Sequence, residues 1–260
     1  MIPRHEFYEA AREFGLDPST IERDYAQNWL LFSFRKIPMA LKGGTGIRKV
    51  FIEDYRFSDD LDFTLLEPIE SGTLQAMIRE AVTQAGNESG IAFEETLPVK
   101  ETKNGTKATV FFRILNRGSA SPVKIDLDLT NPENEKILLP VKELPVFHHY
   151  SDTLDVSVSS YSLEEIMAEK IRSVFQRTRS RDIYDIWQLA GKVDRDLVKS
   201  ILPEKCAYKE INLDLSLLEQ KREKFAAVWR VSLGHQMQEV PDFDLAYRKV
   251  IEEVEFFTRP

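Results

Sequence analysis

YRFSDDLDF, residues 55–63, places two carboxylates, Asp60 and Asp62, two positions apart at the start of a β-prone run. In a strand, residues i and i+2 point to one face, so both acids share a side. Carboxylates held that close repel one another unless a positive charge lies between them, and a divalent cation with oxygen ligands is the usual solution. The stretch therefore predicts a strand that carries a metal site. A solvated strand edge or an acidic turn is the alternative.

A second acidic strand is predicted at VKIDLDL, residues 123–129. Its apolar residues alternate with Lys124, Asp126 and Asp128, so the strand has one apolar and one charged face. Such acids normally face water, which is the alternative here. A two-metal site, however, needs a third carboxylate from a neighbouring strand. We predict that Asp126 supplies it, with Asp128 in reserve.

The stretch ALKGGTGIRK, residues 40–49, has the composition of a small phosphate-binding turn. Gly43 and Gly44 leave backbone amides unobstructed after a short strand, and Thr45 can cap a following helix. Backbone amides at a helix start form a cradle for anions. The spacing matches neither the P-loop nor the dinucleotide fingerprint, so a plain turn is the alternative.

Composition limits the classes of protein that the sequence fits. The 260 residues are 42% apolar and 30% charged, which supports one large domain or two modest ones. The single cysteine, Cys206, excludes an internal disulfide and is typical of a reducing cytosol. No apolar run is long enough to cross a membrane, so we expect a cytoplasmic protein with no membrane partner.

The net charge of -8 excludes a global positive field that would attract nucleic acid. Any polyanion must therefore bind a local patch. The sequence EKIRSVFQRTRSR, residues 169–181, carries five cations against one anion. This run is therefore the candidate patch for a polyanion, which it would bind through phosphate contacts.

Periodicity predicts an α+β region followed by an all-helical region. After Ser162, which forms a capping-box pattern with Glu165, the sequence reads as helical to its end, with breaks near Pro203 and Pro241. We expect two domains, residues 1–160 and 161–260. Within the first domain we predict helices over about 4–36, broken near 15–20, and over 70–87, strands over 38–42, 91–97, 107–115 and 123–130, and turns over 103–106 and 116–122.

The first helices after Ser162 carry a set of paired charges. Lys170 and Arg177 are seven residues apart, so we expect them on one helix face. Asp182 and Asp185 are three apart on the next helix. Solvated helices with routine ion pairs are the common outcome of such patterns. The functional interpretation is that the two cations neutralise a triphosphate and the two acids support them.

Four motifs in one order resemble the AbiEii/AbiGii toxin family. They are LKGGTG, RFSDDLDF, VKIDLD and EEIMAEKIRSVFQRTRSRDIYDIW, and the flanks IERDYAQNWLL and FAAVWRVSLGHQMQEVPDFDLAYRKV extend the resemblance over nearly the whole chain. That family consists of nucleotidyltransferases of the DNA polymerase β type from bacterial toxin–antitoxin and abortive-infection systems. The resemblance implies a polymerase-β-type domain, a mixed β-sheet with flanking helices, followed by an all-helical region.

The resemblance also implies roles for individual residues. Gly43, Gly44 and Thr45 match the glycine motif that opens the nucleotide site, and Asp60 and Asp62 match the metal-binding pair, preceded by Arg56 and Ser58 of the same motif. The helical motif needed for activity is matched by Lys170, Arg181, Asp182 and Asp185. Magnesium or manganese, a nucleoside triphosphate, an RNA acceptor such as the 3′ end of transfer RNA, and a cognate antitoxin are the implied cofactor, substrates and partner.

The predicted reaction is the transfer of a nucleoside monophosphate to an acceptor hydroxyl. The triphosphate lies over residues 43–45 on metal ions held by Asp60, Asp62 and Asp126, and pyrophosphate leaves toward Lys170 and Arg177. Two other functions stay open: a non-catalytic, GTP-type nucleotide-binding protein and a metal-dependent phosphodiesterase. The sequence has no histidine near Asp60, Asp126 or Lys170, which counts against a nuclease that relies on a histidine base.

Overall fold

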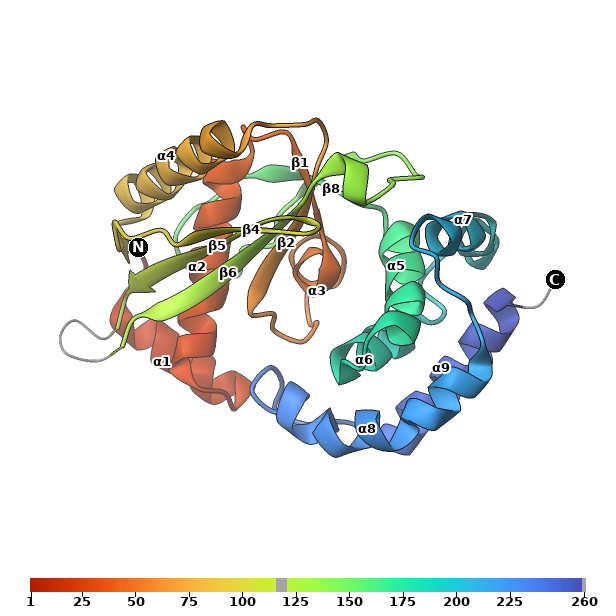
Figure 1. Ribbon diagram of the computed structural model, residues 1–260. Coiled ribbons are helices and arrows are strands. Elements are labelled where there is room, and N and C mark those ends of the chain that lie inside the picture. The colour runs from red at the N-terminus through yellow and green to blue at the C-terminus, as the bar shows by residue number, and fades with distance from the viewer. Residues whose placement is uncertain (116–120, 259–260) are drawn as a thin grey trace. The chain divides into compact units, whose positions relative to one another are not determined.

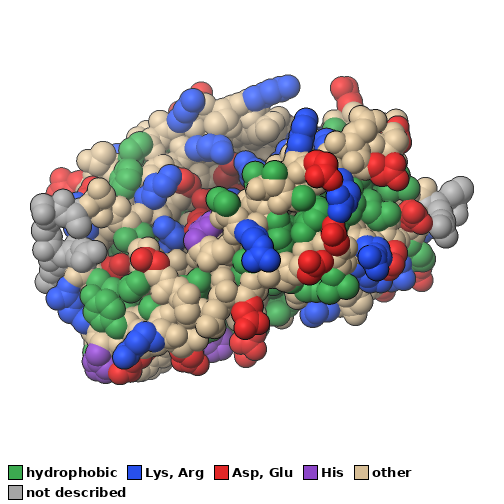
Figure 2. Space-filling model, turned by 90° about the horizontal axis from the view of Figure 1, so that it is seen from below, with side chains coloured by type: hydrophobic (Ala, Val, Ile, Leu, Met, Phe, Trp, Pro, Cys, Tyr) green, Lys and Arg blue, Asp and Glu red, His purple; other side chains and the backbone are tan. Residues whose placement is uncertain are grey.

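The computed structural model describes residues 1–115 and 121–258, so most of the predicted turn at 116–122 lies outside the described residues (Figure 1). The chain divides into two compact units. Unit 1 comprises Met1–Glu135 and Val141–Tyr161, and unit 2 comprises Lys136–Pro140 and Ser162–Pro260. Basic and acidic side chains are interspersed over the face that Figure 2 shows. Among the described helices, none combines the length and hydropathy that a membrane crossing requires.

Unit 1 contains a sheet and the helices that cover it. Its helices are α1 (Arg4–Phe14), α2 (Pro18–Phe34), α3 (Gly43–Gly46) and α4 (Ser71–Ser89), with a π turn over Ile47–Phe51 and a 3-10 turn over Pro132–Asn134. Its strands are β1 (Met39–Lys42), β2 (Asp60–Leu65), β3 (Ala92–Phe93), β4 (Val99–Thr102), β5 (Gly105–Arg113), β6 (Val123–Thr130), β7 (Lys142–Pro145) and β8 (Ser157–Ser160).

The sheet is mixed, as predicted. Its strand order is β3-β5-β6-β2-β1-β8-β7, and β4 pairs with β5 beside β3. The pairs β2–β6 and β1–β8 are parallel, whereas the other pairs are antiparallel. Of the strand expected over 91–97, only Ala92–Phe93 form a strand, β3. The sequence did not indicate β4, β7 or β8. These short edge strands form through pairing with their neighbours, which local pattern does not reveal.

One face of the sheet is closed by the core of unit 1. Leu61, Phe63 and Leu65 of β2 and Ile125, Leu127 and Leu129 of β6 are buried at alternate positions, and α2 packs against β6 and α4. Thr64, on the same side of β2 as Asp60 and Asp62, is buried as well. The predicted break before α2 is confirmed, because Gly15 is left-handed and the Asp17 side chain accepts a hydrogen bond from the Ser19 amide. The acidic residues of β2 and β6 consequently point to the other, open face.

Between Ser162 and Thr258, the regular elements of unit 2 are all helices, as predicted. Its helices are α5 (Leu163–Gln176), α6 (Ser180–Leu189), α7 (Arg195–Tyr208), α8 (Leu215–Leu233) and α9 (Phe243–Thr258). The expected break at Pro203 is wrong, because α7 continues through it, whereas Pro241 does lie between α8 and α9. Burial of Val198, Leu202 and Cys206 on α7 offsets the hydrogen bond that Pro203 cannot donate.

The start of α5 has the predicted cap with a different partner for Glu165. The Ser162 side chain accepts a hydrogen bond from the Glu165 amide, as a capping box requires. The Glu165 carboxylate instead accepts from the amides of Leu138 and Leu139 and lies 2.5 Å from the Lys205 ammonium. These contacts fix residues 136–140 on the helical unit.

Candidate active site

Two glycines in the turn after β1 allow site side chains to approach the backbone closely. Gly43 has a φ of 69°, and a Cβ there would lie 2.5 Å from the Asp62 Oδ2. A Cβ on Gly44 would lie 2.7 Å from a guanidinium nitrogen of Arg56 and 3.3 Å from the Ser58 Oγ. The two glycines thus let Asp62, Arg56 and Ser58 pack directly on the turn. Their contact with a phosphate stays a prediction.

Thr45 has a different role from the one that the sequence suggested. It is fully buried, and its hydroxyl donates a hydrogen bond to the carbonyl oxygen of Asp60. The single turn of α3 begins after Lys42 with no side-chain cap, so the expectation that Thr45 caps this helix is wrong. The hydroxyl instead joins the turn to the first residue of β2, because the fold brings the Asp60 carbonyl beside it.

The parallel pairing of β2 with β6 brings the predicted carboxylates together. Asp60 lies opposite Asp126, and Asp62 lies opposite Asp128. Directly paired residues point to one face, and neighbouring strands are about 4.8 Å apart. All four side chains are half-buried on the open face. Both candidates for the third carboxylate therefore lie beside the Asp60–Asp62 pair.

Neighbouring donors hold Asp126 in its ionised form. Its carboxylate accepts hydrogen bonds from the Lys124 ammonium at 2.8 Å and from the Thr109 hydroxyl at 2.8 Å. Burial raises the pKa of Asp126, but these two hydrogen bonds outweigh burial and leave the pKa below its usual value. Asp128 is paired in turn with Lys107 at 2.9 Å. An ionised carboxylate is the form that a cation binds.

The donor set fits a hard divalent cation. In residues 1–115 and 121–258, no three acidic, histidine or cysteine side chains already converge on one point. The open face nevertheless offers carboxylates from two adjacent strands, and Mg²⁺ and Mn²⁺ prefer oxygen ligands. Asp126 and Asp128 are half-exposed and paired with exposed lysines, so their carboxylates can turn toward Asp60 and Asp62.

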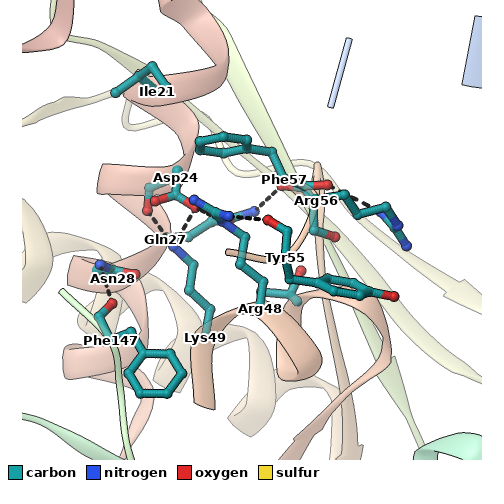
Figure 3. Close-up of polar contacts among 12 residues, drawn as sticks. Ile21, Asp24, Gln27, Asn28, Arg48, Lys49, Tyr55, Arg56, Phe57 and Phe147 are labelled. Carbon is teal, nitrogen blue, oxygen red and sulfur yellow. Dashed lines mark hydrogen bonds and ion pairs between the residues drawn. The ribbon is translucent and has the colours of Figure 1, made fainter. Parts of the chain in front are cut away.

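Sequence reasoning missed a buried charge cluster behind the site, which Figure 3 shows. On α2, Asp24 accepts from the Arg48 Nε at 2.6 Å and lies 2.8 Å from the Lys49 ammonium. Burial raises the pKa of Asp24, but the two cations outweigh it and hold this pKa below its usual range. Burial lowers the pKa of Lys49 to about 8 despite the attraction of Asp24. The Asp24 carboxylate and the Lys49 ammonium are both buried inside unit 1.

This cluster holds the segment that carries Arg56 and Ser58. Arg48 donates to the carbonyl oxygen of Tyr55, and its guanidinium lies 3.6 Å from the centre of the Phe57 ring. From α2, the Gln27 amide donates to the Ser58 carbonyl oxygen at 2.9 Å (Figure 3). The available signal in the sequence was the run of polar residues inside the otherwise apolar, buried α2.

Unit 2 contains the other predicted charges as a cluster of its own. The Lys170 ammonium lies 2.9 Å from Asp182 and 2.7 Å from Asp185, and Arg177 donates two hydrogen bonds to Asp182. Asp182 and Asp185 are buried. Burial raises the pKa of Asp182, but Lys170 and Arg177 outweigh it and lower the pKa below its usual range. Half-buried Arg181 is the neighbour of Asp182 on α6.

The expectation that Lys170 and Arg177 share a helix face is wrong. Helix α5 ends at Gln176, and Arg177 is extended, with a φ of -142°. Asp182 brings the two cations together instead, so the anion that their proximity requires comes from the chain itself. The basic run is also not uniformly exposed, because Lys170 and Arg172 are buried.

Comparisons with known proteins identify the family and the fold. The family model described as nucleotidyl transferase AbiEii toxin, type IV TA system, matches residues 27–249. The structure is similar to MenT4, a nucleotidyltransferase toxin from Mycobacterium tuberculosis, at 18% identity and a TM-score of 0.67 over 100% of this chain and 91% of that one. It is also similar to JHP933 from Helicobacter pylori, at 18% identity and a TM-score of 0.58 over 93% of each chain. No curated protein matches the sequence.

Proposed function

Because the chain belongs to the nucleotidyl transferase AbiEii toxin family of type IV toxin–antitoxin systems, it is a nucleotidyltransferase, and we propose that its acceptor is an RNA hydroxyl. The donor is a nucleoside triphosphate, and the reaction depends on Mg²⁺ or Mn²⁺. We further propose that the chain acts as the toxin of such a system and that a cognate antitoxin protein counteracts it.

The register of β2 against β6 carries the proposal. It places Asp60 and Asp62 opposite Asp126 and Asp128 on the open face, beside a glycine turn into which Asp62 packs. Four carboxylates on one face repel one another, and their repulsion is relieved when cations bind between them. A site that collects carboxylates next to a glycine turn is suited to a metal–triphosphate complex.

The chain's residues have separable roles in the proposed reaction. Asp60, Asp62 and Asp126 hold the metal ions, which when bound supply positive charge to the phosphates. The acceptor oxygen bonds to the α-phosphorus, the bond from that phosphorus to the bridging oxygen breaks, and pyrophosphate leaves. Asp126 accepts the proton of the attacking hydroxyl and, being half-exposed, releases it to water.

Arg56 and Ser58 complete the part of the proposed nucleotide site that lies in unit 1. Arg56 and Ser58 are held against Gly44 by the cluster behind them, which fixes a guanidinium beside the turn. Lys170 and Arg177 are proposed to bind the phosphates, and Arg181, Asp182 and Asp185 to support them. Charge neutralisation is the main contribution of a protein to phosphoryl transfer.

Labelling tests the proposal directly. Each α-labelled nucleoside triphosphate is incubated with the protein, Mg²⁺ and total RNA, and label in RNA is measured together with released pyrophosphate. We expect one or more triphosphates to label RNA in equal amount to the pyrophosphate released. Asp60→Asn is expected to abolish labelling, while the matched control Asp54→Asn, an exposed acid of the preceding loop, keeps it. Labelling that survives Asp60→Asn contradicts the proposed site.

A further inference from the structure

A row of charged side chains crosses the open face of the sheet from β1 to β4. The register pairs Lys42 with Asp62, Asp62 with Asp128, Asp128 with Lys107, and Lys107 with Lys100. Directly paired residues of neighbouring strands point to the same face. The carboxylates thus lie in the middle of the row, and positive charge continues from them to the edge strand β4.

An apolar ring lies on the same face, farther along β5 and β6. Phe111 pairs with Lys124, two residues from Thr109 and Asp126 respectively. Phe111 is half-buried, whereas its neighbours Val110 and Phe112 are buried in the core. An aromatic ring beside lysines is the combination that binds single-stranded nucleic acid, because bases stack on the ring and phosphates bind the cations.

The lysines of this face are available to an added anion. Lys107 and Lys124 have exposed side chains, and their partners Asp128 and Asp126 are themselves 39% and 40% exposed. Exposed ion pairs of this kind contribute little, so a phosphate can replace the carboxylate. Lys100 lies directly opposite Lys107, and two like charges in that position repel, which favours binding of an additional anion beside them.

The positive charge of the β4–β5 hairpin also favours binding of an anion on this face. Lys100, Lys103 and Lys107 are all exposed. The acid between them, Glu101, pairs with Thr106 and by alternation points to the other face. By contrast, the basic run of α5 and α6 buries Lys170 among acids. The hairpin therefore presents the less compensated positive surface.

We propose that Lys100, Lys107, Lys124 and Phe111, the lysine face, bind the single-stranded end of the RNA acceptor. Phosphates contact the lysines and one unstacked base lies on Phe111, so that the terminal hydroxyl reaches the carboxylates in the middle of the row. The inference rests on the proposed function, because it assumes an RNA acceptor. The competing explanation is that lysines on β4 only protect an edge strand from pairing with other chains.

Binding of a fluorescein-labelled, 12-nucleotide single-stranded RNA tests the lysine face without requiring turnover. Anisotropy is measured over a salt series for the wild type, Lys100→Gln/Lys107→Gln and Phe111→Ala. We expect the double variant to weaken binding at least tenfold at low salt. Its plot of log affinity against log salt should be shallower by about 1.4, since each phosphate contact on a single strand contributes about 0.7 to the slope. Phe111→Ala should weaken binding at least fivefold with an unchanged slope.

The matched control removes two lysines elsewhere in unit 1. Lys36 and Lys142 are exposed, and Lys142 lies on β7, the opposite edge of the sheet. Lys36→Gln/Lys142→Gln should keep both the affinity and the salt slope. Equal losses in the two double variants would show a general charge effect and overturn the lysine face, as would a wild type that binds no RNA at low salt.

Nucleotide binding separates a failure of this inference from a failure of the proposed function. Calorimetry with Mg²⁺ and triphosphate is run on the same samples. If the wild type binds triphosphate and labels RNA while Lys100→Gln/Lys107→Gln keeps its RNA affinity, the lysine face is wrong and the proposed function stands. If the wild type neither binds triphosphate nor releases pyrophosphate, the proposed function itself is wrong, whatever the RNA affinity.

Discussion

Unit 1 contains two sets of charged residues that differ in their access to solvent. The carboxylates of β2 and β6 are half-exposed on the open face, and the cations paired with Asp126 and Asp128 are exposed. Asp24, Arg48 and Lys49, in contrast, are buried, and Asp24 pairs with both cations. A buried ion pair stabilises the backbone it contacts, and losing one partner leaves an uncompensated charge. Exposed carboxylates cost little to keep and remain available to a ligand.

The largest effect that this comparison predicts is on the rate of Asp60→Asn. A half-exposed carboxylate that holds a metal ion should matter for transfer and not for folding. We expect the transfer rate to fall by at least about a thousandfold, because metal charge dominates such reactions. The urea midpoint should stay unchanged. If Asp60→Asn loses stability as well as rate, the half-exposed carboxylates do not differ from the buried charges in their contribution to folding.

The choice between Asp126 and Asp128 as the third carboxylate is a second test of the same site. Asp126 has two donors and an ionised carboxylate opposite Asp60. We expect Asp126→Asn to lower transfer about as far as Asp60→Asn, and Asp128→Asn to lower it about tenfold. The two variants are isosteric and lie on one strand, so each is a control for the other. The reverse order of effects would assign the third carboxylate to Asp128.

Arg48→Met should show the opposite behaviour, with stability affected first. It keeps the pairing of Lys49 with buried Asp24 but removes that of Arg48, and removal of one partner from a buried pair costs about 3–5 kcal/mol. Urea unfolding followed by circular dichroism measures the loss. Arg48→Lys should restore part of it, and Lys36→Met is the exposed control. If Arg48→Met unfolds like the wild type, the cluster does not stabilise the fold.

Acid sensitivity provides a further test of the buried set. The folded pKa of Asp24 is lowered from an ordinary value of 3.8, so its charge stabilises the protein fully above that pH. This contribution is lost as pH falls below 3.8 toward the folded pKa, by up to about 1.4 kcal/mol per pH unit. The stability difference between the wild type and Asp24→Asn should therefore shrink from pH 5 to pH 2.5. If the stability difference stays constant over this pH range, the charge of Asp24 does not contribute to stability.

Arg177 shares features with both sets of charges, and its substitution has the smallest predicted effect. Its side chain is 42% exposed, yet it contacts the buried Asp182. We expect Arg177→Gln to change stability by under about 1 kcal/mol, as exposed pairs do. Turnover at subsaturating triphosphate should fall about tenfold if Arg177 binds phosphate. Lys170→Ala is a poorer probe, because it removes the ammonium that buried Asp182 and Asp185 share and so changes stability as well. Unchanged turnover in Arg177→Gln would leave this cluster as a structural element.

Local pattern predicted the parts of the site that lie within one segment. The alternation of acids and apolar residues in β2 and β6 was sufficient to assign both strands and their open face. The caps at Asp17 and Ser162 were predictable because each uses a residue close in sequence. The helix expected through Arg177 and the break expected at Pro203 were wrong because distant contacts decide where those helices end.

The sequence by itself determined which residues share a face, since side-chain alternation has a period of two and needs no partner. It also identified the family through motifs in a fixed order. Only the tertiary structure decided that β2 pairs in parallel with β6, so that Asp60 meets Asp126, and that Lys100 continues the same row at the sheet edge. It likewise decided that Asp24 is buried with Arg48 and Lys49. Register and burial depend on strands and helices far apart in the chain, and no local spacing encodes them.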